Sequence, residues 1–596
     1  MKPRKGSIAI DPRTAAKRRL ARETGYVVKN RGGKASIALV YPNSYEIAMS
    51  NLGYQKIYRM LNDRADILCE RAFLPSGQEI DYFKKHNQKP ATLESGRALA
   101  EFDVIAFSIT FEHDYLNALK ILNLAGIPLK DRDGRAPLVM AGGVAVTMNP
   151  EVMAPFLDFM VIGEGEGIIE PFCDLLIKGE RDLSAFAAIS GIYVPAGYEP
   201  VYKDDGTIEK FAVKEGFPQK VKRAWNHSST ARPNINYIDT PDTVFGDMSL
   251  IEIGKGCGKH CRFCAAGYIY RPTRNGNTNL IMTAIDKGIE RKGKVGLVGS
   301  AIGDHPDVEK IFERIVKGGG EFSVSSLRLD KLSDTMIDLL LKGNCHTITV
   351  APEAGTEALR ARINKKMSDE LILDTARRIA GAWPFKIKMY FIVGLPGETM
   401  KDVEGIVDLV KRVRGVMEPE WKRHGRAGEI TVGVDGFVPK ALTPFQWEPF
   451  EGIKPVAKKL FAVADGLRKT PNVTVQKGSA RQAYAQALLS QGDRRLASLI
   501  ELCMELDGDW SRALRETDLN TDHYATRRKG LDEVLPWSII DDGLRKNYLS
   551  QELSLSGKGK VTPECPPPEK ECHRCGVFVG ACVKVRGGDN RSCSPE

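Results

Sequence analysis

Two long stretches of this chain repeat one pattern, a short apolar strand followed by a helix-like segment. Within residues 36–190, we expect strands and helices that alternate: strands at 36–42, 102–110, 136–143 and 159–166, and helices at 53–63 and 114–126. Parallel strands need long crossover connections, which are usually helical. The first stretch therefore predicts a Rossmann-like, doubly wound parallel sheet, with ligands at the C-terminal ends of its strands.

The second stretch, residues 246–450, contains six such units. Its expected strands are "SLIEIG", "KVGLVGS", "FSVSSLRL", "HTITVAPE", "FKIKMYFIVG" and "ITVGVDGFVP", and helical segments separate most of them. Six units fit a partial (β/α)6 barrel. The predicted fold class is therefore α/β, with a linker at 191–245, a mostly helical region at 451–556 and a Cys-rich tail at 557–596.

The composition predicts neither a membrane span nor secretion. No apolar run reaches about 18 residues, and the basic N-terminus has no apolar segment behind it, so we expect a cytoplasmic protein. The net charge of +10 is concentrated in residues 1–35, a basic N-terminal arm with eleven Lys and Arg against Asp11 and Glu23. A nucleic-acid-binding arm and a solvated terminus both fit this pattern, and we favour the solvated terminus.

The twelve cysteines are not spaced like a disulfide framework. Four of them stand alone among apolar neighbours, as expected for packing residues: Cys69, Cys173, Cys345 and Cys503. The other eight form two clusters, at 257–264 and 565–593. Clustered cysteines in a large chain without a signal peptide indicate metal binding in a reducing compartment.

The first cluster has the spacing C-x3-C-x2-C, formed by Cys257, Cys261 and Cys264. Structural zinc sites usually take four protein ligands, and no second Cys pair lies nearby, although His260 is a candidate fourth ligand. An iron–sulfur cluster with three cysteines leaves one iron without a protein ligand, free to bind a small bidentate molecule. The sequence around the cysteines favours the second alternative.

An aromatic residue, Phe263, stands directly before the third cysteine, and the motif follows the first strand of the barrel-like series. This combination resembles the signature of radical S-adenosylmethionine (radical SAM) enzymes. The resemblance implies a [4Fe–4S] cluster on Cys257, Cys261 and Cys264. It also implies reductive cleavage of S-adenosylmethionine to a 5′-deoxyadenosyl radical, and an electron donor such as flavodoxin or ferredoxin. The resemblance does not identify the substrate or the later reaction.

The same resemblance suggests which residues bind S-adenosylmethionine. Phe263 is expected near the adenine, together with Gly394 of "FIVGLPGE". Ser300 and Asp304 of "VGSAIGDHP" stand where many family members have a Gly-Gly-Glu motif for the amino group. The other two candidates are Glu353, for the ribose hydroxyls, and Arg360, for the methionine carboxylate; an ordinary pair on a helix face is the alternative for these two.

Residues 140–176 resemble the last part of cobalamin-binding domains found ahead of radical SAM enzymes, with a Gly-Gly turn and a later "GEGE". The resemblance implies five residues near the corrin or its nucleotide tail: Gly142, Gly143, Gly163, Ser108 and Thr110. The Asp-x-His-x-x-Gly motif of methionine-synthase-like proteins is missing, and "SYEIAMSNLG" stands in its place. A Rossmann-like domain that binds nothing is equally compatible with the sequence.

The second cluster offers Cys572, Cys575 and Cys582 as metal ligands, with Cys565 or Cys593 as the fourth. An auxiliary iron–sulfur cluster, a zinc ion and free thiols all fit this spacing. Two other function classes also remain. One is a tRNA-modifying methylthiotransferase-like enzyme, which would normally carry three cysteines in its N-terminal domain. The other is a non-enzymatic regulatory protein that binds zinc or cobalamin.

Overall fold

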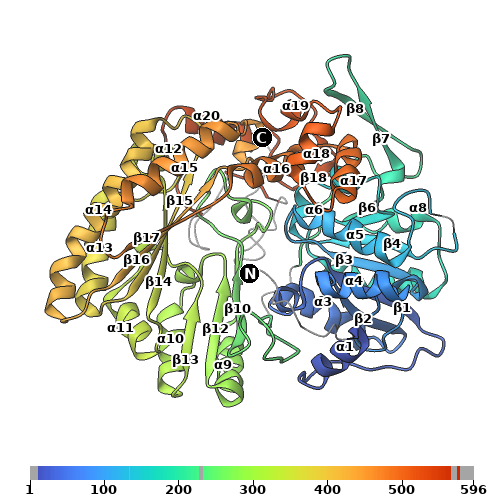
Figure 1. Cartoon of the computed structure of the whole chain (residues 1–596), viewed down its shortest axis with the longest axis horizontal. Coiled ribbons are helices and arrows are strands. Elements are labelled where there is room, and N and C mark those ends of the chain that lie inside the picture. Colours follow the sequence, from blue (N-terminus) through green and yellow to red (C-terminus); the bar gives the residue numbers. More distant parts are fainter. Residues whose placement is uncertain (1–10, 133, 227–231, 566–573, 578–596) are drawn as a thin grey trace, which may run out of the picture.

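The computed structural model describes residues 11–132, 134–226, 232–565 and 574–577. A Rossmann-like part and a barrel part lie side by side, and helices of the C-terminal region join them along one edge (Figure 1). This arrangement confirms the predicted fold class. It also brings the C-terminal ends of the strands, in the Rossmann-like part and in the barrel part, toward the middle of the molecule.

The Rossmann-like sheet has six strands in the order β2-β1-β3-β4-β5-β6, and only β6 is antiparallel to its neighbour. Its strands are β1 (Ala35–Tyr41), β2 (Ile67–Phe73), β3 (Val104–Ser108), β4 (Leu138–Gly142), β5 (Phe159–Val161) and β6 (Ile192–Tyr193). Its main helices are α3 (Leu52–Asp63), α4 (Gly77–His86), α5 (Asp114–Ala125), α6 (Val144–Met148), α7 (Ile169–Ile177) and α8 (Leu183–Ala187).

Both faces of this sheet are covered, as its sequence predicts. Along β1, Ile37 and Leu39 belong to the hydrophobic cluster that contains residues of α3 and α7. The alternate residues Ala38 and Val40 belong to the cluster that contains residues of α5. Side chains alternate between the faces of a strand, so an uninterrupted apolar run is buried only when helices lie on both sides.

The barrel part consists of two four-stranded sheets. The first has the order β11-β10-β12-β13 and the second the order β14-β15-β16-β17. The strands are β10 (Ser249–Lys255), β11 (Arg274–Asn275), β12 (Lys294–Gly299), β13 (Glu321–Val324), β14 (Thr347–Glu353), β15 (Lys386–Val393), β16 (Glu429–Gly436) and β17 (Val473–Lys477). All six predicted strands are present. The two sheets meet where the backbone N–H of Leu327 donates to the carbonyl of Thr349 at 2.9 Å.

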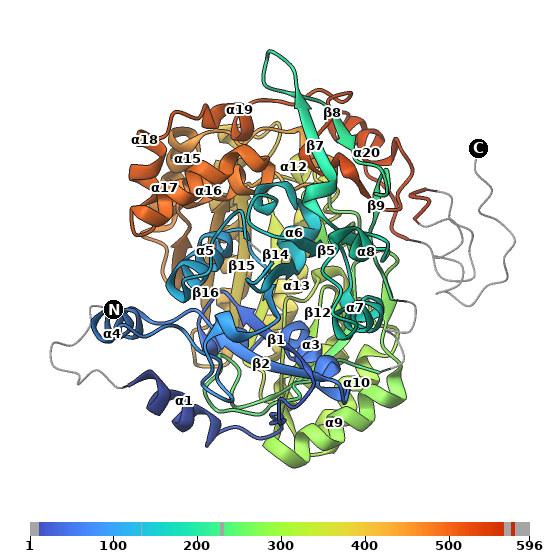
Figure 2. The same cartoon turned by 90° about the vertical axis from the view of Figure 1, so that its right-hand side faces the viewer.

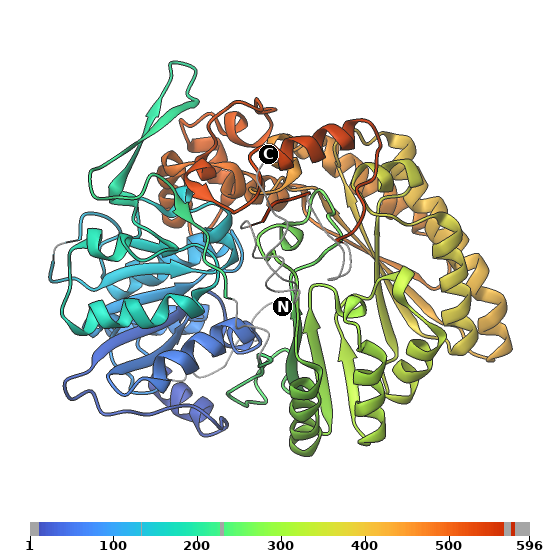
Figure 3. The same cartoon turned by 180° about the vertical axis from the view of Figure 1, so that it is seen from behind.

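Helices cover the outer side of these sheets (Figure 3). They are α9 (Thr278–Lys292), α10 (Val308–Lys317), α11 (Asp334–Lys342), α12 (Glu357–Arg362), α13 (Asp369–Ala382), α14 (Met400–Arg423) and α15 (Ile453–Leu467). Several strands were not predicted, among them β2 and β6 of the Rossmann-like sheet and β11 and β17 of the barrel part. Residues 451–556 were expected to be mostly helical, but β17 adds a parallel edge strand beside β16. It is short and largely exposed, so its residues lack the apolar run that marks the other strands.

The C-terminal region packs on both parts. Its helices are α16 (Ala480–Gln491), α17 (Ala497–Glu505), α18 (Trp510–Glu516), α19 (Thr521–Ala525) and α20 (Tyr548–Gly557). The segment between the Rossmann-like part and the barrel part forms a hairpin of β7 (Tyr198–Tyr202) and β8 (Ile208–Val213). The next strand, β9 (Val221–Lys222), pairs with β18 (Ile540–Asp541). The linker and the C-terminal region are thus joined by backbone hydrogen bonds.

The described part of the basic arm packs against the Rossmann-like part. Its helix α1 (Pro12–Leu20) has no buried residue and lies along the edge of the molecule (Figure 2). Just after it, Glu23 is buried and accepts two hydrogen bonds from the buried guanidinium of Arg71, the shorter at 2.6 Å. The solvated terminus expected from the sequence therefore ends before Glu23.

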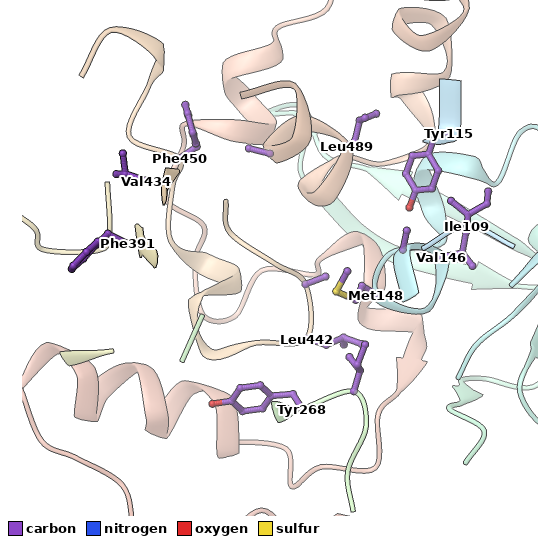
Figure 4. Close-up of a cluster of buried hydrophobic side chains, with 14 of the residues drawn as sticks. Ile109, Tyr115, Val146, Met148, Tyr268, Phe391, Val434, Leu442, Phe450 and Leu489 are labelled. Atoms are coloured by element: carbon purple, nitrogen blue, oxygen red, sulfur yellow. The ribbon is translucent and has the colours of Figure 1, made fainter. Parts of the chain in front are cut away.

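The three parts share one continuous hydrophobic core. Figure 4 shows Tyr115 of the Rossmann-like part, Leu489 of the C-terminal region and Phe391 of the barrel among its members. An ion pair adds to this contact: Arg494, partly exposed, pairs with the buried Glu151 at 2.8 Å across the same interface. A shared core of this kind fixes the position of the Rossmann-like part relative to the barrel part.

We predict that Gly163→Ala destabilises the protein by about 2–4 kcal/mol, because both strain and overlap must be relieved. Gly163 has a φ of +106°, and a Cβ there would lie 2.1 Å from the carbonyl oxygen of Ala224. Thermal denaturation of the two proteins measures the difference. Gly77→Ala is the matched control, since a Cβ there meets no atom within 4 Å. Equal losses in both variants would contradict this account.

Candidate functional site

The three cysteines of the first cluster lie on the loop between β10 and β11, at the C-terminal end of β10. We call residues 256–273 the cluster loop. Burial raises the pKa of the Cys257 thiol to about 12 and that of Cys264 to about 11. The neighbouring Cys261 contributes to both shifts, although in the described structure the three side chains are not arranged to hold one metal ion. Thiols of this kind release their protons when their sulfur atoms bind a metal.

Two glutamates of the Rossmann-like part hold the two ends of the cluster loop. Lys255, just before the loop, donates to Glu166 at 3.0 Å, and Arg274, just after the loop, pairs with Glu164. Both glutamates belong to the "GEGE" turn after β5. Burial alone would raise the pKa of Glu166, but Lys255 and Lys56 lower it to about 2. The ends of the loop are therefore fixed by buried ion pairs.

The C-terminal region holds the middle of the loop. The Arg262 guanidinium is fully buried and donates to Glu552 of α20 at 3.1 Å and to the carbonyl of Lys560 at 2.8 Å. Lys259 donates to Glu564 at 2.6 Å, and the backbone N–H of Cys565 donates to the carbonyl of Gly258 at 3.0 Å. Residues 548–565 therefore hold the middle of the cluster loop in place through hydrogen bonds and ion pairs.

Two of the predicted S-adenosylmethionine contacts lie at the C-terminal edge of the barrel. Phe263 packs against a hydrophobic cluster that includes Leu395, Phe437 and Phe445, from the segments after β15 and β16. Gly394 has a φ of +82°, and its backbone N–H donates to Glu398 at 2.6 Å. The apolar surface beside the cysteines thus comes from the ends of two neighbouring strands.

The prediction for Arg360 is wrong. Its side chain is fully buried, and its three guanidinium nitrogens donate to the carbonyls of Met367 and Ala354 and to the carboxylate of Asp369. This arginine therefore stabilises the connection from α12 to α13. The helix-face pair considered as the alternative is absent too, because Glu353 accepts from Lys365 at 3.2 Å instead.

Three cations near the cysteines were not singled out in the sequence. Lys365 and Arg328 both lower the pKa of the Cys261 thiol, which burial raises. The third, Lys259, is buried and lies 3.1 Å from Asp304. Periodicity could not find them, because each lies in a loop: Lys259 between Cys257 and Cys261, Arg328 after β13 and Lys365 after α12. The signal available was their place within the cysteine motif and in the loops that follow the third and fourth barrel strands.

Two cavities border the cluster loop, and they separate the remaining candidates. One, of about 980 Å³, is lined by Asp304, Lys259 and Cys565 among others. The other, of about 550 Å³, lies between the Rossmann-like part and the barrel and includes Ser300. We call the second one the interdomain cavity. Ser300 and Asp304, both candidates for binding the amino group, therefore line different spaces.

All five residues predicted near cobalamin line the interdomain cavity: Ser108, Thr110, Gly142, Gly143 and Gly163. The Thr110 hydroxyl lies 2.9 Å from that of Tyr41. The cavity also reaches apolar residues inside the Rossmann-like part, including Leu39 of β1 and Phe172 of α7. It is therefore a deep apolar space with a polar rim, the usual character of a small-molecule site.

Two of these glycines are also needed for contacts within the chain. A Cβ on Gly143, which has a φ of +114°, would lie 2.3 Å from the carbonyl oxygen of Ile109. A Cβ on Gly163 would lie 2.1 Å from the carbonyl oxygen of Ala224. Their presence is explained by the turns that close the strand ends, with or without a ligand.

The second cysteine cluster is described only in part. Cys572 and Cys582 lie outside the described residues, whereas Cys575 is buried and Cys565 is partly exposed. The Cys565 sulfur lies 3.3 Å from Nε2 of His260, a residue of the cluster loop. Within the described ranges, no three His, Cys, Asp or Glu side chains are arranged to hold one metal ion.

Among the described residues, even the long helix α14 is too polar to cross a membrane, and no other helix has the required length and apolar character.

Comparison with known proteins agrees with the cysteine motif. Residues 53–195 match the family model for the N-terminal part of radical SAM proteins, and residues 251–410 match the model for the radical SAM superfamily. Together the two models cover just over half of the chain. The second match contains the whole cluster loop, most of β10 and the strands β11 to β15.

Relatives of this chain include proteins of two kinds. The uncharacterised protein MJ0966 of Methanocaldococcus jannaschii is 28% identical over 473 residues, covering 78% of this chain and 90% of the relative. A tRNA-2-methylthio-N(6)-dimethylallyladenosine synthase of a Wolbachia species is 25% identical over 203 residues. That match covers 31% of this chain and 45% of the relative, so it spans less than half of either protein.

Among solved structures, OxsB with aqua-cobalamin bound, a cobalamin-dependent S-adenosylmethionine radical enzyme, aligns over 93% of this chain and 84% of its own. The identity is 13% and the TM-score 0.45. The family models and the cysteine motif within their range carry the assignment: this chain is an enzyme of the radical SAM superfamily.

Proposed function

We propose that Cys257, Cys261 and Cys264 hold the [4Fe–4S] cluster at which this enzyme cleaves S-adenosylmethionine. The observation that carries the proposal is the position of three partly buried cysteines with this spacing on one loop at the C-terminal edge of the barrel. This donor set fits a cluster with one iron left for S-adenosylmethionine. When bound, the cluster supplies the electron that breaks the sulfonium bond.

The residues around the loop orient S-adenosylmethionine. Phe263 offers an apolar surface to the adenine, and Glu353 stays the candidate for the ribose. We assign the methionine carboxylate to Lys365 and Arg328 in place of Arg360, since both are cations close to Cys261. Lys365 now pairs with Glu353 at 3.2 Å and Arg328 with Asp330 at 2.9 Å, so binding would exchange these partners for the ligand. Ser300 and Asp304 stay candidates for the amino group, each from its own cavity.

We also propose that the interdomain cavity holds cobalamin. The residues fit in two respects: the cavity is deep and apolar inside the Rossmann-like part, and its rim is polar where the barrel begins. Ser108 and Thr110 would hold the nucleotide tail, and Lys56 and Lys255 line the same space. When bound, cobalamin supplies a carrier for a methyl group, which makes methylation or rearrangement of a small molecule the favoured reaction class.

A tRNA-modifying methylthiotransferase-like enzyme is the second candidate, favoured by the similarity to the Wolbachia synthase. The N-terminal cysteines argue against it, because Cys69 and Cys173 are both completely buried in the core of the Rossmann-like part. Co-purifying RNA that is lost as the salt concentration rises would favour this candidate.

The remaining cofactors and partners are proposals as well. An auxiliary iron–sulfur cluster or a zinc ion at Cys572, Cys575 and Cys582 would be distinguished by metal analysis of the purified protein. About four irons per chain with matching sulfide would indicate the first cluster alone, and about eight would indicate two. Flavodoxin or ferredoxin is the expected electron donor.

Replacing all three cysteines of the cluster loop by Ala should abolish cleavage of S-adenosylmethionine. Without thiolates the cluster has no protein ligands, so the iron content should fall by about four per chain. Chromatography of 5′-deoxyadenosine formed under dithionite by anaerobic protein measures the activity. Cys345→Ala, a buried cysteine outside the site, is the control. Full cleavage by the triple variant would overturn the proposal.

The cobalamin proposal predicts corrin absorbance in protein expressed with hydroxocobalamin. Ser108→Phe should remove it, because the larger side chain would fill the mouth of the interdomain cavity. Ser498→Phe, at an exposed position of α17, should keep it. The absorbance spectrum after gel filtration measures retention. Wild-type protein that stays free of corrin would contradict the proposal.

A further inference from the structure

Asn364 is a buried residue beside the cluster loop that no motif of the sequence singles out. It lies two residues after α12, with only 2% of its surface exposed and a φ of +58°. Asparagine tolerates this left-handed conformation better than most residues and is common just past the end of a helix. Ending α12 would explain the backbone of Asn364, but it does not explain the contacts of its side chain.

The side-chain amide of Asn364 uses both of its ends. Its NH2 group donates to the backbone carbonyls of Lys259 and His260, each at 3.1 Å. Its carbonyl oxygen accepts from the backbone N–H of Thr562 at 2.8 Å. Carbonyls need donors and an N–H needs an acceptor, so these partners fix the orientation of the amide. A carboxylate or an apolar side chain of the same size could not make all three bonds.

These bonds join three segments that are far apart in the chain. The two accepting carbonyls lie between the first and second cysteines of the cluster loop, and Thr562 belongs to the C-terminal region. Asn364 itself lies in the connection that follows β14 and α12. The backbone N–H of Arg262 also donates to the carbonyl of Ile363 at 3.1 Å. The cluster loop is therefore tied to the connection after β14 by backbone and side chain alike.

The residue next to Asn364 is Lys365, one of the two cations assigned to the methionine carboxylate. Lys365 is buried close to the cysteines: burial raises the pKa of the Cys261 thiol, and the charge of Lys365 lowers it. A lysine side chain is long and flexible, so the place of its charge depends on where its backbone is held. Asn364 holds this backbone to the loop that carries the cysteines.

We propose that Asn364 is a positioning residue for S-adenosylmethionine. It fixes the distance between the three cysteines and Lys365, and so aligns the cluster with the cation that receives the methionine carboxylate. Asn364 does not touch the ligand in this account, so its effect passes through Lys365. The inference rests on the proposed function, because Lys365 has this role only if S-adenosylmethionine binds at the cysteines.

Asn364→Gly tests the proposal, since glycine keeps the left-handed backbone without strain and loses all three side-chain bonds. Calorimetry measures binding of S-adenosylmethionine to anaerobic protein with an oxidised cluster, which does not cleave the ligand. The dissociation constant should rise at least about tenfold, because a charged partner is displaced. The kcat should fall less than about threefold, since the carboxylate contact is made before and during cleavage alike. The iron content should stay at about four per chain.

Asn344→Gly is the matched control. Asn344 also follows a helix, with a φ of +59°, but it is exposed and its side chain donates to Glu321 at 2.7 Å. This variant should bind S-adenosylmethionine within about twofold of the wild type. Asn364→Asp is a second test, because it keeps the acceptor for Thr562 and loses both donors to the cluster loop. It should weaken binding at least as much as Asn364→Gly.

A double-mutant cycle shows whether Asn364 acts through Lys365. Lys365→Met alone should weaken binding at least about tenfold, and adding Asn364→Gly should weaken it less than about twofold further. The inference is overturned if the two effects multiply, if Asn364→Gly binds like the wild type, or if it loses its iron. Failure of the proposed function has another signature: Lys365→Met would bind normally, and the triple cysteine variant would still cleave S-adenosylmethionine.

Discussion

The site depends on one buried cation, the guanidinium of Arg262. It stands between Cys261 and Cys264 in the chain and is bonded to Glu552, Thr562 and two stretches of backbone. A buried charge that loses its partner costs roughly 3–5 kcal/mol. The cluster loop therefore cannot leave this position without unpairing Arg262, and residues almost 300 positions later determine its shape.

This dependence changes how the chain is divided. In the sequence, residues 557–596 have little sign of a core and read as a tail. In the structure, the first of them belong to the site, because Thr562 contacts Arg262 and Glu564 contacts Lys259. Their role comes from what they touch, and contacts over such a separation leave no periodic pattern.

The strands and helices were predictable for a local reason, since the alternation of apolar residues is written into each segment. The cysteines were predictable because their ligand spacing is local as well. Arg360 and Glu353 show the limit. Both lie near the expected place, yet Arg360 is taken up by Asp369, and Glu353 by Lys365. Which charged group pairs with which is a property of the folded chain, and a single sequence does not contain it in readable form.

The "GEGE" turn shows how the two parts act together. Its sequence resembles a ligand-binding turn of the Rossmann-like part, and in the structure its glutamates hold Lys255 and Arg274 at the two ends of the cluster loop. The Arg274–Glu164 pair is buried and the Lys255–Glu166 pair is largely so, and charge interactions in such places are little screened. The turn that borders the interdomain cavity is thus bonded to the loop that carries the cysteines. These ion pairs form a continuous physical connection between the border of the cavity and the loop that carries the cysteines.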